Sequence, residues 1–250
     1  MTPGELAMVG GAALVAGAIN AVAGGGSLIT FPTLVAVGVP PVLASVTNTV
    51  ALCPGYLGAT IAQRRDLVGQ GRRIGRLVPV GVLGGVGGAV LLLESGEKAF
   101  NTIVPFLILA AALLVAAQDK LRAWLLARTP AKHVEMIALL PVSLAAVYGG
   151  YFGAGMGVMI LGALGAVLSD SLLRINALKQ LVSLSVNFSA ALLFVLWGHV
   201  DWPIAAVMAV TSLVGGALGG VLARHVPPVA LRALVVVIGL VVSAIYFVKL

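Results

Sequence analysis

Two glycine clusters interrupt long apolar runs of the sequence, and they are the residues best suited to hold a small ligand. The first reads AGGGS at 23–27 and the second reads FGAGMG at 152–157. Three glycines inside a helix cost about 3 kcal/mol relative to alanine, so a break in the helix is expected there. A helix that restarts after such a break points unpaired N–H groups and the positive end of its dipole at its own beginning, which suits an anion.

The predicted binding residues at the two breaks are five glycines and one serine, namely Gly24, Gly25, Gly26, Ser27, Gly153 and Gly155. The Ser27 hydroxyl is expected either to cap the new helix or to donate to a substrate oxygen. The alternative for the glycines is close packing, since small residues are common where membrane helices touch. Binding is favoured because packing does not explain why both glycine-bearing segments are too long for a single crossing.

A second group of glycines is predicted to serve packing. Their four-residue spacing is the GxxxG pattern, which lets two helix backbones approach closely. The residues are Gly81, Gly84, Gly85, Gly88, Gly215, Gly216, Gly219 and Gly220.

Lys179 is the only Lys or Arg that falls well within a predicted membrane span, away from its ends. A cation in the bilayer core costs about 2.5–3.5 kcal/mol on insertion scales, so an intramembrane lysine is a functional candidate by default. Lys179 is predicted to bind the anion or to set the potential of its pathway. The alternative is snorkelling, in which the ammonium reaches water or lipid headgroups near Arg174.

Three asparagines on predicted spans, Asn48, Asn176 and Asn187, are further binding candidates. Their amides can donate to an oxyanion, whereas ordinary hydrogen bonding between helices, worth about 0.6 kcal/mol, is the alternative. Asn20, Thr30, Thr47 and Thr49 are weaker candidates of the same kind.

The composition identifies the surroundings as a lipid bilayer. The chain of 250 residues is 60% hydrophobic and 9% charged, with a mean hydropathy of +1.14, so polar side chains cannot cover a water-facing surface. The apolar runs are long and lack a period of two, which predicts helices. The net charge of +7 does not indicate nucleic acid, because the basic residues lie in short loops between the apolar runs.

Apolar segments occur at about 6–37, 42–62, 77–93, 100–118, 134–168, 172–197, 203–223 and 229–248. Six have the length of one crossing, and the two that carry the glycine clusters are longer. These two are predicted to be re-entrant hairpins or discontinuous helices. The order of segments recurs at a shift of about 130 residues, with Asn48 opposite Asn176, so the chain is predicted to be one membrane domain made of two four-segment repeats, 1–125 and 126–250.

The basic residues favour an inverted second repeat. If the two long segments re-enter, most basic residues face the cytoplasm, and only Lys98 and Lys249 lie outside; if all segments cross fully, the repeats are parallel and four basic residues lie outside. Cytoplasmic loops of membrane proteins are enriched in Lys and Arg, which supports the inverted arrangement. The residues placed inside are Arg64, Arg65, Arg72, Arg73, Arg76, Lys120, Arg122, Arg128, Lys132, Arg174, Arg224 and Arg232.

Several motifs carry a family resemblance. The stretches AGAINAVAGGGSLITFPTL, TNTVAL and PGYLGA in the first half, and YGGYFGAGMGVMIL, NALKQL and NFSAALLF in the second, resemble the TauE/SafE family of sulfite exporter-like permeases, also called TSUP. The resemblance covers essentially the whole chain. It implies an inner-membrane permease for a small sulfur-containing anion such as sulfite or an organosulfonate.

Other functions remain as alternatives. An anion channel, or a carrier of a non-sulfur anion such as a carboxylate, would share the glycine breaks, although inverted repeats with broken helices favour alternating access. An enzyme is not expected, because the apolar segments contain no clustered His, Asp or Glu, and no cofactor or metal site is predicted. The expected partners are the small anion and the lipid bilayer, with a homo-oligomer as a further possibility.

Overall fold

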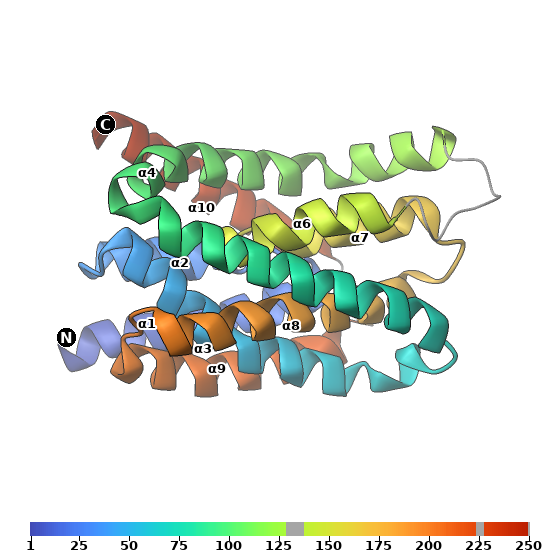
Figure 1. Cartoon of the computed structure of the whole chain (residues 1–250), viewed down its shortest axis with the longest axis horizontal. Coiled ribbons are helices and arrows are strands. Elements are labelled where there is room, and N and C mark those ends of the chain that lie inside the picture. The colour runs from blue at the N-terminus through green and yellow to red at the C-terminus, as the bar shows by residue number, and fades with distance from the viewer. Residues whose placement is uncertain (129–137, 224–227, 250) are drawn as a thin grey trace.

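The chain forms a bundle of helices that run along one common direction (Figure 1). The computed structural model describes residues 1–128, 138–223 and 228–249, and these ranges contain helices without a strand. The elements are α1 (Pro3–Val22), α2 (Ser27–Ala36), α3 (Pro41–Ala62), the 3-10 helix η1 (Arg64–Leu67), α4 (Gly71–Arg128), α6 (Leu139–Tyr151), α7 (Met156–Val167), α8 (Leu172–Trp197), α9 (Trp202–Leu222) and α10 (Pro228–Lys249).

The helices have the length and composition of membrane-crossing segments. Within the described ranges, five are long and apolar enough to cross a bilayer: Pro3–Val22, Pro41–Ala62, Gly71–Ala117, Leu172–Trp197 and Trp202–Leu222. The expected all-helical membrane protein is therefore confirmed. The third of these helices contains two predicted segments, because α4 turns back on itself at Gly96, where φ is 70° and ψ is 167° (Figure 1).

Both long apolar segments divide into two helices at their glycine clusters. The segment predicted at 6–37 becomes α1 and α2, and the segment predicted at 134–168 becomes α6 and α7. Gly24 and Gly25 have φ values of 87° and 93°, and Gly153 and Gly155 have φ values of 80° and 78°. Only glycine adopts this left-handed region without strain, so the clusters end one helix and redirect the chain into the next.

Gly26 has an ordinary helical φ of −57°, so a positive φ does not explain why glycine is needed at this position. A Cβ on Gly26 would collide with the carbonyl oxygen of Ala16. The start of α2 therefore lies against α1 more than one turn before α1 ends, and α2 doubles back along α1.

The predicted packing glycines all lie at close helix contacts, where an added Cβ would collide with the neighbouring helix. Those of α4 face α6 and α8, and those of α9 face α1 and α3. The packing prediction is confirmed for all of them: Gly81, Gly84, Gly85, Gly88, Gly215, Gly216, Gly219 and Gly220. One consequence is that the third apolar segment of each sequence half, in α4 and α9, packs on the first two segments of the other half, so the halves interlock.

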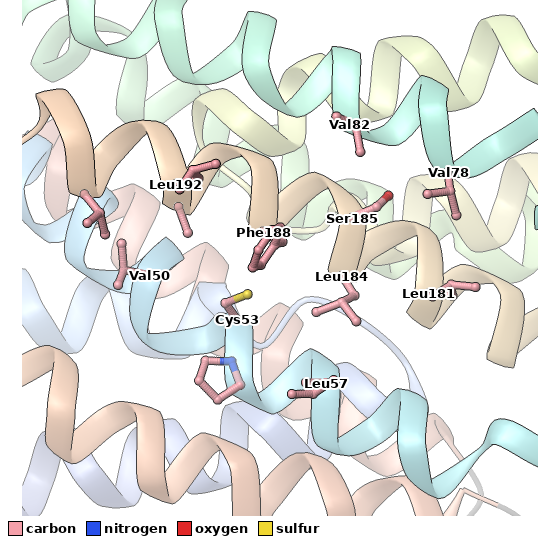
Figure 2. A pocket seen from close by; sticks show the side chains of 13 residues that line it. Val50, Cys53, Leu57, Val78, Val82, Leu181, Leu184, Ser185, Phe188 and Leu192 are labelled. Carbon is pink, nitrogen blue, oxygen red and sulfur yellow. The ribbon is translucent and has the colours of Figure 1, made fainter.

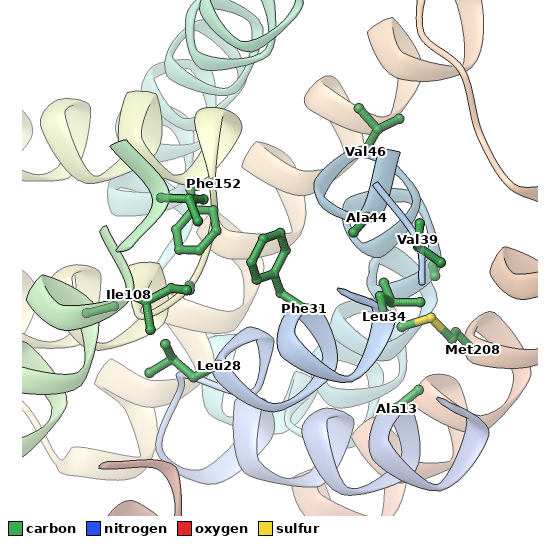
Figure 3. Close-up of a cluster of buried hydrophobic side chains, with 14 of the residues drawn as sticks. Ala13, Leu28, Phe31, Leu34, Val39, Ala44, Val46, Ile108, Phe152 and Met208 are labelled. Atoms are coloured by element: carbon green, nitrogen blue, oxygen red, sulfur yellow. The ribbon is translucent and has the colours of Figure 1, made fainter. Parts of the chain in front are cut away.

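An aromatic cluster joins the two broken helix pairs. The Phe31 ring of α2 packs edge-on against Phe152, which ends α6, with ring centroids 5.1 Å apart, and Figure 3 shows the two rings facing each other. Phe100 of α4 lies 6.3 Å from Phe31 and 6.1 Å from Phe152. All three side chains are buried in the same hydrophobic core.

Six of the described arginines, in η1 and at the starts of α4 and α8, gather at one end of the bundle. The segment around η1, the start of α4 and the 168–171 turn all lie there, whereas the 37–40 turn, the bend of α4 and the 198–201 turn lie at the opposite end (Figure 1). Arg64, Arg65, Arg72, Arg73, Arg76 and Arg174 belong to the first end. Lys132 and Arg224, which the sequence places on the same side, lie outside the described residues.

Candidate functional site

The two glycine breaks meet inside the bundle. A Cβ on Gly24 would lie 3.0 Å from the amide nitrogen of Val158, and a Cβ on Gly157 would lie 3.3 Å from the Cα of Gly24. The backbone of the first break therefore touches the first turn of α7. Gly25 and Gly155 face other helices: Gly25 lies beside Val115 and Val235, and Gly155 lies beside Ala111.

The start of α2 offers a free backbone donor. The Gly26 amide donates to Asn20 Oδ1 over 2.7 Å, and the Leu28 amide bonds to the Gly25 carbonyl over 3.0 Å. The Ser27 amide has no partner among the described residues. The expectation that the Ser27 hydroxyl caps α2 is wrong, because Gly26 holds the N-cap position and no side chain caps it there.

The start of α7 likewise offers a backbone amide without a partner among the described residues. Its N-cap is Gly155, again without a side-chain cap, and the Gly157 amide has no partner in the part of the chain that the structure describes. The Tyr148 hydroxyl donates to the carbonyl of Ala154 over 2.7 Å and holds the non-helical turn in place. Asn20 and Tyr148 thus support the two breaks from the preceding helices, α1 and α6.

Lys179 of α8 lies at the junction of the two breaks. Its side chain is 0% exposed, and Nζ donates to the carbonyl of Asn20 over 2.8 Å. A Cβ on Gly157 would lie 3.9 Å from Nζ. Snorkelling is therefore the wrong interpretation. The ammonium sits between the end of α1 and the start of α7, and this one protein acceptor leaves two of its three N–H donors available.

No buried acid in the described part of the chain balances this cation. Lys179 is the only charged residue among the buried side chains of the described ranges, which include no Asp or Glu. An unpaired buried charge is costly, so such a group is expected to have a counter-ion in the working protein. Together with the free Ser27 and Gly157 amides, the ammonium makes the junction electropositive.

Asn176 connects α8 to the end of α1. Its Nδ2 donates to the Ala21 carbonyl over 2.9 Å and to Gln63 Oε1 over 3.0 Å, and Gln63 Nε2 donates to the same Ala21 carbonyl over 3.2 Å. The Asn176 amide group thus forms ordinary hydrogen bonds between helices, as the alternative to ligand binding predicts. Its buried Oδ1 has no partner among the described residues. No motif in the sequence predicts a role for Gln63.

The other two predicted asparagines stand apart from these contacts. Asn187 Nδ2 donates to the Ser183 carbonyl of its own helix over 3.0 Å. Asn48 lies on α3, and its buried Oδ1 has no hydrogen-bond partner among the described residues. Both remain predictions as ligand-binding residues. Further buried side-chain atoms without a partner belong to Thr30, Ser45, Gln180 and Ser183.

An ionic cluster closes the arginine-rich end of the bundle. Asp170 lies 2.7 Å from Arg73 Nη1 and 3.1 Å from Arg174 Nε, and Arg174 Nη1 donates to the carbonyl of Val68 over 3.0 Å. The hydrogen bond from Arg73 is the main cause that lowers the pKa of Asp170 to about 2. The cluster ties the η1 segment to the turn between α7 and α8.

A large groove lies elsewhere, on the outer face between α3, α4 and α8 (Figure 2). Its volume is about 660 Å³, and it is lined by apolar side chains such as Phe188 and Leu192 together with Cys53 and Ser185. Because it holds no charged residue, it is not a site for an anion. Within the described residues, no group of three or more His, Cys, Asp or Glu is placed to hold a metal ion.

Comparison with known proteins places these features in a family of transporters. Residues 9–246 match the family described as sulfite exporter TauE/SafE. A probable membrane transporter protein of Haemophilus influenzae is 30% identical over 230 residues, which cover 92% of this chain and 89% of that protein. The probable membrane transporter protein YfcA of Escherichia coli K12 is 28% identical over 234 residues, which cover 93% and 86%.

Proposed function

This chain belongs to the sulfite exporter TauE/SafE family, and from that premise we propose that it is a permease of the bacterial inner membrane that exports a small sulfur-containing anion of the sulfite or organosulfonate type. Its similarity to probable membrane transporter proteins extends along nearly the whole chain. The choice of anion and the direction of transport are the proposed parts.

The observation that carries the proposal is the junction of the two breaks beside Lys179. The starts of α2 and α7 each present a free amide, at Ser27 and Gly157, and the buried ammonium has no acidic partner. Helix starts stabilise anions through their N–H groups and dipoles. An anion at this junction would offset the cost of burying the cation.

We further propose that the chain is an inverted repeat in which the α1–α2 and α6–α7 pairs are re-entrant hairpins. Two observations support this arrangement. The connections of the two pairs to their neighbours lie at opposite ends of the bundle (Figure 1). The interlocking is also reciprocal, since α9 packs on α1 and α3 while α4 packs on α6 and α8. The arginine-rich end is then the cytoplasmic face.

Transport by this architecture is proposed to occur by alternating access. Lys179 is fully buried, and Asn20 and Ser27 are each 5% exposed, so the junction is closed to both faces in this conformation. Opening it requires one group of helices to move against the other around a fixed site, as in other transporters with broken helices. The ionic cluster around Asp170 lies where such a movement would open the cytoplasmic side.

The energetics favour export. Moving one negative charge out of a cell with a negative interior releases about 2.3 kcal/mol per 100 mV, so an exporter needs no coupled ion. Import would need coupling, and the described ranges bury no Asp or Glu that would relay protons.

Counterflow in proteoliposomes tests the proposal. Vesicles loaded with unlabelled sulfite, thiosulfate, sulfoacetate, sulfate, a carboxylate or chloride are each mixed with a trace of the same anion in labelled form, and protein-free vesicles serve as the control. Accumulation of label driven by sulfur oxyanions supports the assignment. Exchange driven only by carboxylates would favour a carboxylate carrier, and electrical conductance without counterflow would indicate a channel.

A further inference from the structure

Gln180 is a buried amide without a hydrogen-bond partner. Its side chain is 0% exposed, and both Nε2 and Oε1 lack a partner among the described residues. One turn further along α8, the hydroxyl of Ser183 is also fully buried and also lacks a partner. Since buried polar groups in folded proteins are nearly always paired, these atoms are exceptions that require an explanation.

The two residues belong to the helix face that lines the junction of the breaks. Gln180 lies one turn beyond Asn176, whose amide contacts the end of α1 at Ala21. Ser183 lies one turn beyond Lys179, whose ammonium contacts Asn20. Residues three and four positions apart share one face of a helix, so the four side chains form a continuous polar strip on α8.

The chemistry of the strip restricts what can bind to it. Lys179 supplies one positive charge, and no other buried side chain of the described ranges is charged. A monoanion would be neutralised, whereas a dianion would leave a net negative charge buried, which is costly. The amide of Gln180 has both donor and acceptor atoms, and a donor on the ligand, such as a hydroxyl group, would satisfy its acceptor.

We infer that Gln180 and Ser183 form a neutral polar subsite beside Lys179 that recognises a hydroxyl group, so that the site takes hydroxyl-bearing monoanions. Hydrogen sulfite and hydroxyalkyl sulfonates have this chemistry, and sulfate does not. The inference rests on the proposed function, because it specifies the substrate class of the same site.

The test compares matched anions in the purified protein. We expect isethionate, which carries a hydroxyl, to bind about tenfold more tightly than ethanesulfonate, which lacks it, and sulfate to bind most weakly. In Gln180→Leu, the preference for isethionate should disappear while the affinity for ethanesulfonate stays within about twofold. Ser183→Ala should reduce the preference in part. Ser189→Ala is the matched control, because the Ser189 hydroxyl already donates to Val186 in the same helix.

A second readout excludes a merely structural role. Because Gln180 forms no hydrogen bond to the described protein, its replacement by leucine should leave the melting temperature without ligand unchanged or raise it. Equal binding of isethionate and ethanesulfonate by the wild type, or a preference that survives in Gln180→Leu, would overturn the inference. Failure of the wild type to move any anion in counterflow would instead overturn the proposed function.

Discussion

Removing the charge of Lys179 should weaken anion binding at least tenfold without unfolding the protein. The ammonium is fully buried, and its one contact with a protein acceptor is the bond of 2.8 Å to the Asn20 carbonyl. A hydrogen bond to a charged group contributes about 1.5–3 kcal/mol, which corresponds to a loss of about 10-fold to 150-fold in affinity. We therefore expect Lys179→Gln to lose at least a factor of ten in anion binding and in flux.

Arginine should restore only part of the function. Lys179→Arg keeps the charge, but its planar guanidinium is larger, and the space is limited because a Cβ on Gly157 would already lie 3.5 Å from the Lys179 Cδ. Lys179→Met serves as the folding control. It removes a desolvation cost of several kcal/mol and leaves one carbonyl unpaired at about 1–3 kcal/mol, so the melting temperature without substrate should not fall.

The assays are flux in proteoliposomes at matched protein amounts and thermal stabilisation by sulfite. If Lys179 only caps the end of α1, Lys179→Gln would transport sulfite at nearly the wild-type rate and would be stabilised equally by it. That result would refute the assignment of Lys179 to the anion site.

Three further predictions address the breaks, the topology and the ionic cluster. Gly25→Leu should insert and fold but lose transport, because it fills a left-handed break position. Gly85→Leu should instead lower the yield of folded protein, because its side chain would collide with α8. Full transport by a stable Gly25→Leu protein would contradict the assignment of the first break to the anion site. In a Cys53→Ala background, Gly198→Cys should react with an impermeant maleimide only from outside and Val68→Cys only from inside, and labelling of both cysteines from the same side would contradict the inverted repeat. Asp170 has a pKa lowered to about 2, so its stabilising contribution should be present above about pH 4 and be lost as the pH falls toward 2; the melting temperature of Asp170→Asn in detergent should lack this acid-dependent fall, and a parallel fall in both proteins would contradict the ionic contribution of Asp170.

The positions of the helix breaks could be predicted because glycine has a direct effect on the backbone. The clusters at 23–27 and 152–157 both end helices where expected, and four of their glycines adopt positive φ. The packing glycines could also be predicted from the sequence, because GxxxG spacing places small residues on one helix face. In these cases the signal is local, and tertiary contacts do not override it.

Other parts of the site depend on contacts between distant segments. Gly26 is required because α2 passes the Ala16 carbonyl, which no local pattern reveals. Gln63 and Tyr148 support the ends of helices through hydrogen bonds, yet in the sequence they resemble ordinary residues of helix ends. The prediction that Ser27 caps α2 is wrong because Gly26 has helical dihedrals and holds the N-cap position itself. Ser27 therefore lies in the first turn of α2.

The location of the bound anion tests the central claim most directly. Crystals of the protein soaked with selenite, a heavier analogue of sulfite, allow the selenium to be located by anomalous scattering. The account predicts a peak at the junction of the two breaks, within hydrogen-bonding reach of Lys179 Nζ and the Gly157 amide, and no such peak in Lys179→Gln. Selenium bound only at the exposed arginines of the η1 segment, with none beside Lys179, would contradict it.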